Sequence, residues 1–156
     1  MAKRATLLDD SARLMRDFMS SAVFFQDVVA RAAGLTASDL QTLGVLVSEG
    51  PRSPGELAAR TGISTGGGIT QLVDRLVKAG FVTRERSEQD RRRVLVTPVL
   101  EEVGRRIGPL YAGVGADWQS FLESLSTAEL ETCVRFLATA VEINRRHAAE
   151  VGDTEA

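Results

Sequence analysis

Residues 64–93 constrain the fold of this 156-residue chain more than any other segment. Apolar side chains recur there at i, i+3, i+4, i+7 and i+8, which places them along one stripe of an amphipathic helix. The stripe comprises Ile69, Leu72, Val73, Leu76 and Val77. Gly80 stands where a left-handed helix end is expected. We therefore predict a helix that starts at about residue 64, faces a core and ends at Gly80.

A basic β-hairpin is predicted directly after this helix. Residues 82–86 alternate apolar and polar side chains, as a half-buried strand does, and a second strand is predicted at residues 94–96. The run Asp90-Arg91-Arg92-Arg93 lies where the hairpin turns, and arginines on a narrow loop can enter a minor groove. Asp90 is expected to hold a neighbouring arginine through a charge-assisted hydrogen bond. The alternative is an exposed hairpin whose charges serve solubility.

Two helix-start signals precede this segment. Thr36–Asp39 has the spacing of a capping box and opens a helix that stops at Gly50. Ser53–Glu56, with proline at the first helical position, opens a short helix that ends at Gly62. The side chains expected to point inward are Leu40, Leu43, Leu46, Val47, Leu57 and Ala58. Two short helices joined by a tight turn, the second polar on its outer face, form a helix-turn-helix.

Long apolar helices are predicted on both sides of this module. The first covers roughly residues 9–32, and the second starts after Pro98 and is kinked or broken at Pro109. Ser126–Glu129 is a further capping box, which opens a last helix whose polar end is expected to fray from Asn144 onward. The inward positions of that helix are Leu130, Val134, Leu137, Ala138 and Val141. A small module cannot cover all these apolar faces, so we predict that they interlock with a second copy across a two-fold axis.

Charge is unevenly distributed along the chain. The net charge is −2, but residues 51–97 contain nine basic and five acidic side chains, a net charge of +4, which leaves −6 for the remainder. A basic centre flanked by acidic helices fits a protein whose middle contacts phosphates. A solvated surface with chance asymmetry is the alternative.

Several classes of protein are disfavoured by composition. No run of eighteen apolar residues is present to span a bilayer, and no secretory segment starts the chain, so we expect a cytoplasmic location. One cysteine, Cys133, and one histidine, His147, are too few for a disulfide or a structural metal site, and no cofactor is expected. No nucleophile with an adjacent base is recognisable, so an enzyme is not expected.

The chain resembles the multiple antibiotic resistance regulator (MarR) family of transcription factors over nearly its full length. The segments that carry the resemblance are LTASDLQTLGVL at 35–46, SPGELAARTGIS at 53–64, TGGGITQLVDRLVKAGFVTR at 65–84 and DRRRVLV at 90–96. The family pattern continues into Leu-Thr, whereas Val96-Thr97-Pro98 stands here, so the strand end and next helix start are expected to be displaced by about two residues.

The resemblance implies a mainly α fold with a small β-hairpin wing. It implies an N-terminal dimerisation helix at 1–34, a winged helix-turn-helix DNA-binding domain at 35–97 and C-terminal dimerisation helices at 98–156. The implied function is that of a homodimeric regulator, a repressor relieved by a small-molecule effector, that binds double-stranded DNA at a pseudopalindromic operator. A winged-helix module that binds another protein instead of DNA remains the alternative.

Candidate DNA contacts follow from the resemblance and from the basic hairpin. They are Ser64, Thr65, Gly66, Gly67, Thr70, Gln71, Arg75, Arg84, Arg86, Asp90, Arg91, Arg92 and Arg93. Each glycine inside a helix costs about 1 kcal/mol relative to alanine, so the run at 66–68 needs a compensating role. That role is close approach of the helix start to DNA, close packing on the preceding helix, or a frayed first turn.

An effector pocket is implied between the dimerisation helices and the reading domain. The candidates to line it are Phe18, Phe25, Tyr111 and Trp118, which suit a small effector that can be aromatic. Aromatic residues at helical spacing are more often simple core residues.

Overall fold

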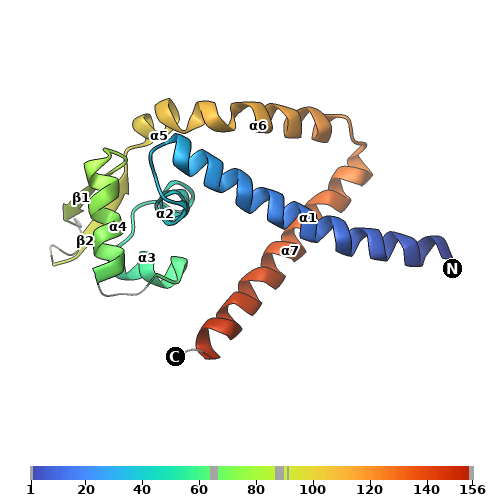
Figure 1. The fold of residues 1–156 in the computed structure, drawn as a ribbon, viewed down its shortest axis with the longest axis horizontal. Helices are drawn as coiled ribbons and strands as arrows, with labels where there is room; N and C mark the ends of the chain where they lie inside the picture. Colours follow the sequence, from blue (N-terminus) through green and yellow to red (C-terminus); the bar gives the residue numbers. More distant parts are fainter. Residues whose placement is uncertain (1, 64–66, 87–89, 91, 155–156) are drawn as a thin grey trace. The chain divides into compact units, whose positions relative to one another are not determined.

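The computed structural model describes residues 2–63, 67–86, 90 and 92–154 (Figure 1). Within these ranges the chain forms seven helices and two strands. The elements are α1 (Ala2–Ala32), α2 (Ala37–Glu49), α3 (Pro54–Thr61), α4 (Gly67–Lys78), β1 (Val82–Arg86), β2 (Val94–Pro98), α5 (Leu100–Arg106), α6 (Gly108–Glu123) and α7 (Thr127–Thr154). They fall into two compact units, residues 1–110 and 111–156. The functional division at residues 34 and 97 stays a prediction.

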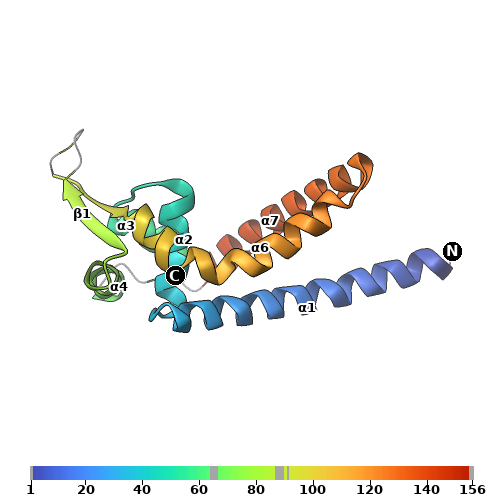
Figure 2. The same cartoon turned by 90° about the horizontal axis from the view of Figure 1, so that it is seen from above.

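The helix-turn-helix and its wing share one hydrophobic core. Helices α2, α3 and α4 pack together, and the hairpin lies beside α4 (Figure 2). The side chains that are at most 2% exposed include Leu43, Leu46, Leu57, Ile69, Leu72, Val73, Leu76, Phe81 and Val96. Burial of this many large apolar side chains makes the winged helix a complete folding unit within one chain. The predicted fold class is confirmed.

The five residues predicted to point inward on the last helix, Leu130, Val134, Leu137, Ala138 and Val141, are exposed in the chain. In the winged helix, two residues predicted to point inward are exposed. Val47 is 46% exposed and Val77 is 39% exposed. On α2, the buried polar residues Asp39 and Thr42 occupy the core side, so the buried face is rotated and Val47 lies at its edge. On α4, Val77 lies at the margin of a stripe centred on Leu72 and Leu76, and the core is too narrow to cover it.

Helix starts and stops lie where local signals predict them. The capping boxes of Thr36 with Asp39 and of Ser53 with Glu56 both form. The predicted stops have positive φ angles, at Gly34, Gly50, Gly62 and Gly80. Because reciprocal bonds within four residues define each of these starts, the sequence alone is sufficient to locate them.

The hairpin is longer than predicted, and an additional residue, Arg52, pairs with its second strand. Strand β1 pairs with β2 from Val82 opposite Pro98 to Arg86 opposite Val94. Strand β2 thus ends two residues later than expected from periodicity, in agreement with the displacement inferred at Val96-Thr97-Pro98. On its other side, Val96 exchanges two backbone hydrogen bonds with Arg52, at 2.8 and 3.2 Å. This bridge attaches the connection between α2 and α3 to the wing.

The long helices differ from expectation at two ends and agree with it at the break near Pro109. Helix α1 starts at Ala2 instead of residue 9. The predicted break near Pro109 is present, because α5 ends at Arg106 and α6 starts at Gly108. Helix α7 is opened by the predicted Ser126–Glu129 capping box but continues to Thr154, so the prediction of fraying from Asn144 is wrong. The run Arg145, Arg146, Ala148, Ala149 and Glu150 consists of residue types that favour a helix.

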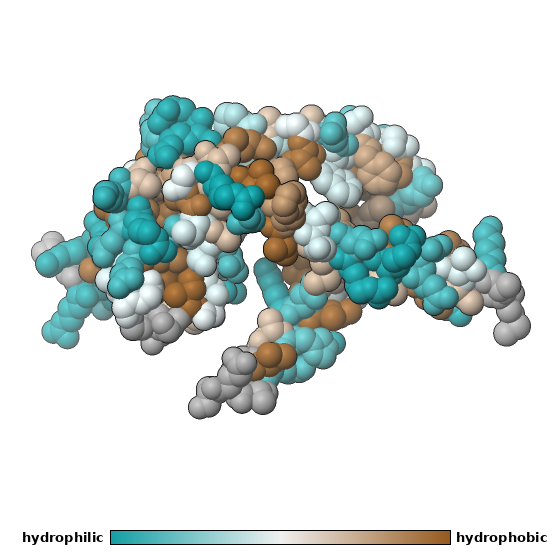
Figure 3. Space-filling view, viewed as in Figure 1, coloured by the Kyte–Doolittle hydropathy of each residue, from teal (hydrophilic) through white to brown (hydrophobic). Residues whose placement is uncertain are grey.

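Large apolar side chains on the long helices are exposed. They include Leu14, Phe18 and Phe24 on α1, Trp118 and Phe121 on α6, and Val134, Phe136, Leu137 and Val141 on α7. Figure 3 shows apolar residues interspersed with polar ones on the surface. Among the described residues, no helix is both long and apolar enough to cross a membrane.

Candidate nucleic-acid interface

The outer face of α4 is polar and exposed. It presents Gly67, Thr70, Gln71, Asp74 and Lys78 on the side opposite the buried stripe. Amide, hydroxyl and ammonium groups are the donor types that bind base edges and phosphates in a major groove. Lys78 was not among the predicted contacts, although it lies seven residues after Gln71 and therefore on the same face.

One flank of α4 is fixed to α2 by a buried carboxylate. Arg75 donates from Nε to both Asp39 carboxylate oxygens at 3.2 Å and from Nη2 to Oδ1 at 2.7 Å. Asp39 is 2% exposed and also accepts the backbone N–H of Thr36 at 3.1 Å. Burial raises the pKa of Asp39, but the hydrogen bonds from Arg75 and Thr36 outweigh it and hold the pKa below 3.8. Arg75, a predicted DNA contact, therefore also locks the orientation of α4.

The other flank of α4 is fixed to the wing. Arg84 on β1 forms an ion pair with Asp74 and reaches the carbonyl oxygen of Thr70 at 3.5 Å. Both side chains are exposed enough for salt to weaken the pair. The pair therefore contributes more to the orientation of α4 on the hairpin than to the free energy of unfolding. The predicted contact Arg84 thus lies back along α4, and the hairpin and the helix are coupled.

A third ion pair joins the wing to α3. Arg93 Nη2 lies 3.0 Å from Glu56 Oε1, and Glu56 also closes the capping box of α3 with Ser53. Hydrogen bonds from the Ser53 hydroxyl and backbone, together with Arg93, lower the pKa of Glu56 to about 2. Arg93, another predicted DNA contact, is therefore held by a carboxylate at the start of α3.

The tip of the wing is shaped by Asp90. Its carboxylate accepts the backbone N–H of Arg92 at 3.0 Å, and its carbonyl oxygen accepts that of Arg93 at 2.9 Å. These bonds fix the turn through the backbone. The predicted charge-assisted bond from Asp90 to a neighbouring arginine side chain stays a prediction. Arg86 and Arg92 are exposed near the tip. The predicted contacts Ser64, Thr65, Gly66 and Arg91 lie outside the described residues.

A side chain at Gly67 would meet no steric clash. A Cβ atom placed on Gly67 would meet Gln71 Nε2 at 3.8 Å, which is an ordinary contact. Close packing on α3 therefore does not require a glycine at this position. Two explanations for a glycine at position 67 remain, namely close approach of a ligand and a frayed first turn.

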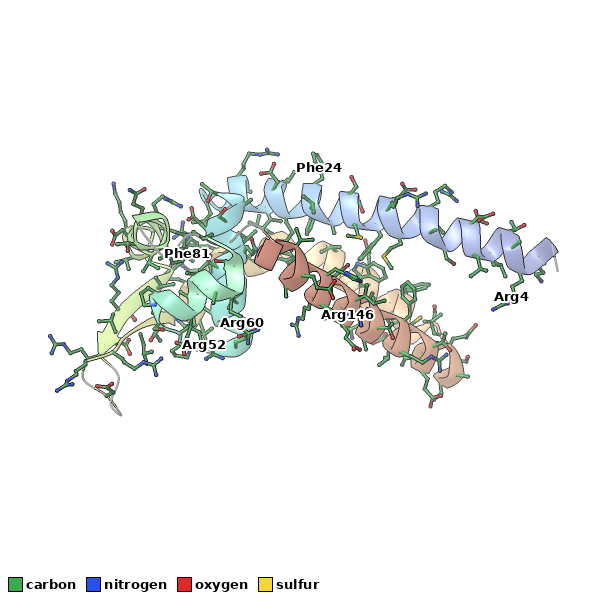
Figure 4. The ribbon with its side chains drawn as sticks, turned by 90° about the horizontal axis from the view of Figure 1, so that it is seen from below. Arg4, Phe24, Arg52, Arg60, Phe81 and Arg146 are labelled. Carbon is green, nitrogen blue, oxygen red and sulfur yellow. The ribbon has the colours of Figure 1, made fainter. Side chains whose placement is uncertain are left out.

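A cluster of charges joins α2, α3 and the turn between them. Glu49 Oε2 is buried and lies 3.1 Å from Arg60 Nη2 and 3.5 Å from Arg52 Nη2 (Figure 4). It makes no well-aligned hydrogen bond, so charge attraction holds the two arginines. No sequence pattern predicts this cluster, because its members come from two helices and the turn between them.

The candidate effector residues divide between the two units. Phe18 and Phe25 lie seven residues apart on α1, and Tyr111 and Trp118 lie seven apart on α6. Trp118 meets Phe121 edge to face, with ring centroids 6.1 Å apart. A shallow hollow on α6 is lined by Val114, Asp117, Trp118 and Phe121. A pocket shared by the four candidate residues stays a prediction.

No group of three potential metal ligands occurs among the residues that the structure describes. Cys133 on α7 is partly exposed and forms no disulfide.

Comparison with known proteins gives consistent results. A family model described as MarR family matches residues 33–93. YcgE, an HTH-type transcriptional regulator of Bacillus subtilis strain 168, is 36% identical over 140 residues, which are 90% of each chain.

Solved structures share the fold. A MarR family protein from Bacillus stearothermophilus has 25% identity and a TM-score of 0.66, over 86% of this chain and 95% of that one. Apo MarR from E. coli has 23% identity and a TM-score of 0.58, over 83% and 94% of the two chains. The similarity extends over the long helices as well as the reading domain.

Proposed function

Since the chain belongs to the MarR family of DNA-binding transcriptional regulators, we propose that it acts as a homodimeric repressor at a pseudopalindromic operator. The observation that carries this proposal is that ion pairs hold α4 on both flanks. Arg75 fixes one flank to Asp39 of α2, Arg84 of β1 holds the other flank through Asp74, and the polar face between them is left open. A helix held in this way can enter a major groove without first being ordered.

The proposed contacts fall into two groups. Gly67, Thr70, Gln71 and Lys78 face the major groove from α4, and the predicted residues Ser64 to Gly66 extend this group toward the helix start. Arg86, Arg91 and Arg92 place positive charge at the wing, where it enters the adjacent minor groove or pairs with phosphates. Arg75, Arg84 and Arg93 contribute to the positive field and hold the reading elements together.

Dimerisation through the long helices is the second part of the proposal. The exposed apolar side chains of α1, α6 and α7 need cover, and a second copy provides it with closed two-fold symmetry. The two copies of α4 then lie one helical turn of DNA apart, about 10 base pairs centre to centre.

Relief of repression by a small ligand is the third part. The aromatic side chains of Phe18, Phe25, Tyr111 and Trp118 supply surface for an apolar or aromatic effector. The two reading domains lie at different distances in the DNA-free and the DNA-bound dimer. An effector that binds the DNA-free dimer more tightly than the DNA-bound dimer lowers the affinity for the operator.

Fluorescence anisotropy tests the proposal. The purified protein is titrated into the duplex upstream of its own gene and into a scrambled duplex of equal length, each across a salt series. We expect tight binding to the first duplex only, weakening as salt rises because phosphate contacts release counterions.

The wing is tested with the double variant Arg91→Ala/Arg92→Ala. Loss of up to two phosphate contacts lowers the slope of log affinity against log salt by up to about two. Arg31→Ala, in the last turn of α1, is the control that removes positive charge outside the wing. Equal, weak binding of both duplexes by the native protein would instead favour a winged helix that binds another protein.

A further inference from the structure

Helices α1 and α4 end in the same way. In α1, Leu35 N–H bonds to Ala30 O at 2.8 Å and Gly34 N–H bonds to Arg31 O at 3.0 Å. In α4, Phe81 N–H bonds to Leu76 O at 3.0 Å and Gly80 N–H bonds to Val77 O at 2.9 Å. Both glycines have φ angles in the left-handed region. Each end is therefore a Schellman motif, written in the sequence as Ala-Gly followed by a buried apolar residue.

This motif leaves the last carbonyl groups of each helix end without a capping bond. The capping bonds satisfy carbonyls further back in the last turn, but not that of the alanine just before the glycine. Arg106 donates to both of these carbonyls. Its Nη1 lies 2.7 Å from Ala79 O at the end of α4, and its Nη2 lies 3.4 Å from Ala33 O at the end of α1.

The electrostatics favour a cation at this position. Both helices direct the negative end of their dipole at the Arg106 guanidinium, and hydrogen bonds from a charged donor are stronger than neutral ones. The guanidinium also lies over the ring of Phe81, 4.1 Å from its centroid. Phe81 is fully buried, and its carbonyl oxygen accepts the N–H of Val99, which leads into α5. Arg106 therefore joins α1, α4 and α5 at one point.

The neighbouring arginine has no such role. Arg105 pairs with Glu102 in its own helix, with donor to acceptor distances of 2.6 and 3.2 Å. The two residues are adjacent, carry the same charge and lie on the same short helix. Arg105 is therefore a matched control for Arg106.

We propose that Arg106 is a positioning residue for DNA binding, which sets the angle of the recognition helix α4 relative to α1. The inference rests on the proposed function, in which α1 belongs to the dimer interface and α4 reads DNA. In a dimer, this angle determines the distance between the two copies of α4, and hence the half-site spacing that the protein accepts. The guanidinium is suited to the task because its planar fork holds two acceptors in fixed directions, which a lysine ammonium on a flexible chain does not do.

The test compares full-length native protein, Arg106→Gln, Arg106→Lys and Arg105→Gln. The first probe is the upstream duplex, in which footprinting locates the repeat that the protein covers. The other two probes carry one base pair inserted or one base pair deleted at the centre of that repeat. Affinities are measured by anisotropy, and circular dichroism verifies at the same temperature that each variant is folded. We expect Arg106→Gln to bind the native duplex about tenfold more weakly, which corresponds to ~1.4 kcal/mol, and to lose its preference for native spacing.

Arg105→Gln is expected to keep both affinity and spacing preference, and Arg106→Lys to lie between the two. A purely structural role would lower binding to all three duplexes by one factor and leave the preference unchanged, which would overturn the inference. If Arg106→Gln does not fold, Arg106→Lys decides, and native behaviour of that variant would overturn it. Lack of specific binding by the native protein would overturn the proposed function and the inference together, whereas agreement between Arg106→Gln and Arg105→Gln would overturn the inference alone.

Discussion

The winged-helix region and the long helices differ in where their apolar side chains lie. In the first, side chains such as Leu72, Leu76 and Phe81 are at most 1% exposed. On α7, Val134 is 61% exposed and Leu137 is 50% exposed. The core of the winged helix is thus formed within one chain, whereas the long helices expose apolar side chains, which we propose a second copy covers. Changes in the two regions should therefore affect different measurements.

The largest effect is expected from charges on α7. In the double variant Val134→Asp/Leu137→Asp, two carboxylates would have to be desolvated in the dimer interface, which weakens association by about 4 kcal/mol, or a thousandfold. Light scattering should detect monomers at micromolar concentration. The control Thr132→Asp/Thr139→Asp adds the same charge at exposed positions of the same helix that lack apolar side chains and should remain dimeric. Dimers in both variants would contradict the assignment of this surface.

A core truncation should act on the other region. Leu72→Ala removes a side chain that is 1% exposed, and we expect a loss of about 2–5 kcal/mol in the free energy of unfolding. Urea denaturation measures the loss, and the dimer should persist in light scattering below the transition. Val77→Ala is the matched control on the same helix and should cost far less, because Val77 is 39% exposed. Similar losses for the two variants would mean that the stripe on α4 is wider than described.

The ion pair between α2 and α4 should have an intermediate effect. Asp39→Asn leaves Arg75 without its carboxylate, and we expect a loss of about 2–3 kcal/mol at neutral pH. Because the pKa of Asp39 is lowered in the folded state, its contribution is fully present above pH 3.8 and is lost as the pH falls through the folded-state pKa. The difference between native protein and variant should therefore shrink only below about pH 4. A difference that is constant down to pH 2 would contradict the assigned pair.

The smallest effect on stability is expected at Gly67, and it has the opposite sign. Gly67→Ala fills open space and improves helix propensity, so the free energy of unfolding should rise by about 0.5–1 kcal/mol. DNA affinity should fall, because a methyl group is added where the helix start approaches the duplex. Thermal unfolding and anisotropy measure the two quantities on the same sample. Unchanged affinity would favour the frayed first turn as the reason for the glycine.

Local signals predicted the fold well. The capping boxes at Thr36, Ser53 and Ser126 lie where expected, since each depends on residues at most three positions apart. The sequence also identified the hairpin and the break at Pro109. It failed at Val47 and Val77, because periodicity shows the direction of a buried face but not its width.

The contacts that hold the candidate interface in place could not be predicted in the same way. Asp39 and Arg75 are 36 residues apart, and Arg106 reaches a carbonyl group 73 residues away. Such contacts arise from the packing of helices and have no sequence period. Resemblance identified the residues of the candidate interface, but only the structure shows that Arg75, Arg84 and Arg93 are held by carboxylates.

The three capping boxes have a consequence for the rate of folding. Each closes a helix start within four residues, so no long loop needs to be ordered before α2, α3 or α7 begins to form. Chains dominated by local contacts fold on a microsecond to millisecond scale. Encounter of two chains should then be the slow step, and stopped-flow refolding should show a rapid phase independent of protein concentration, followed by a slower one that accelerates with it.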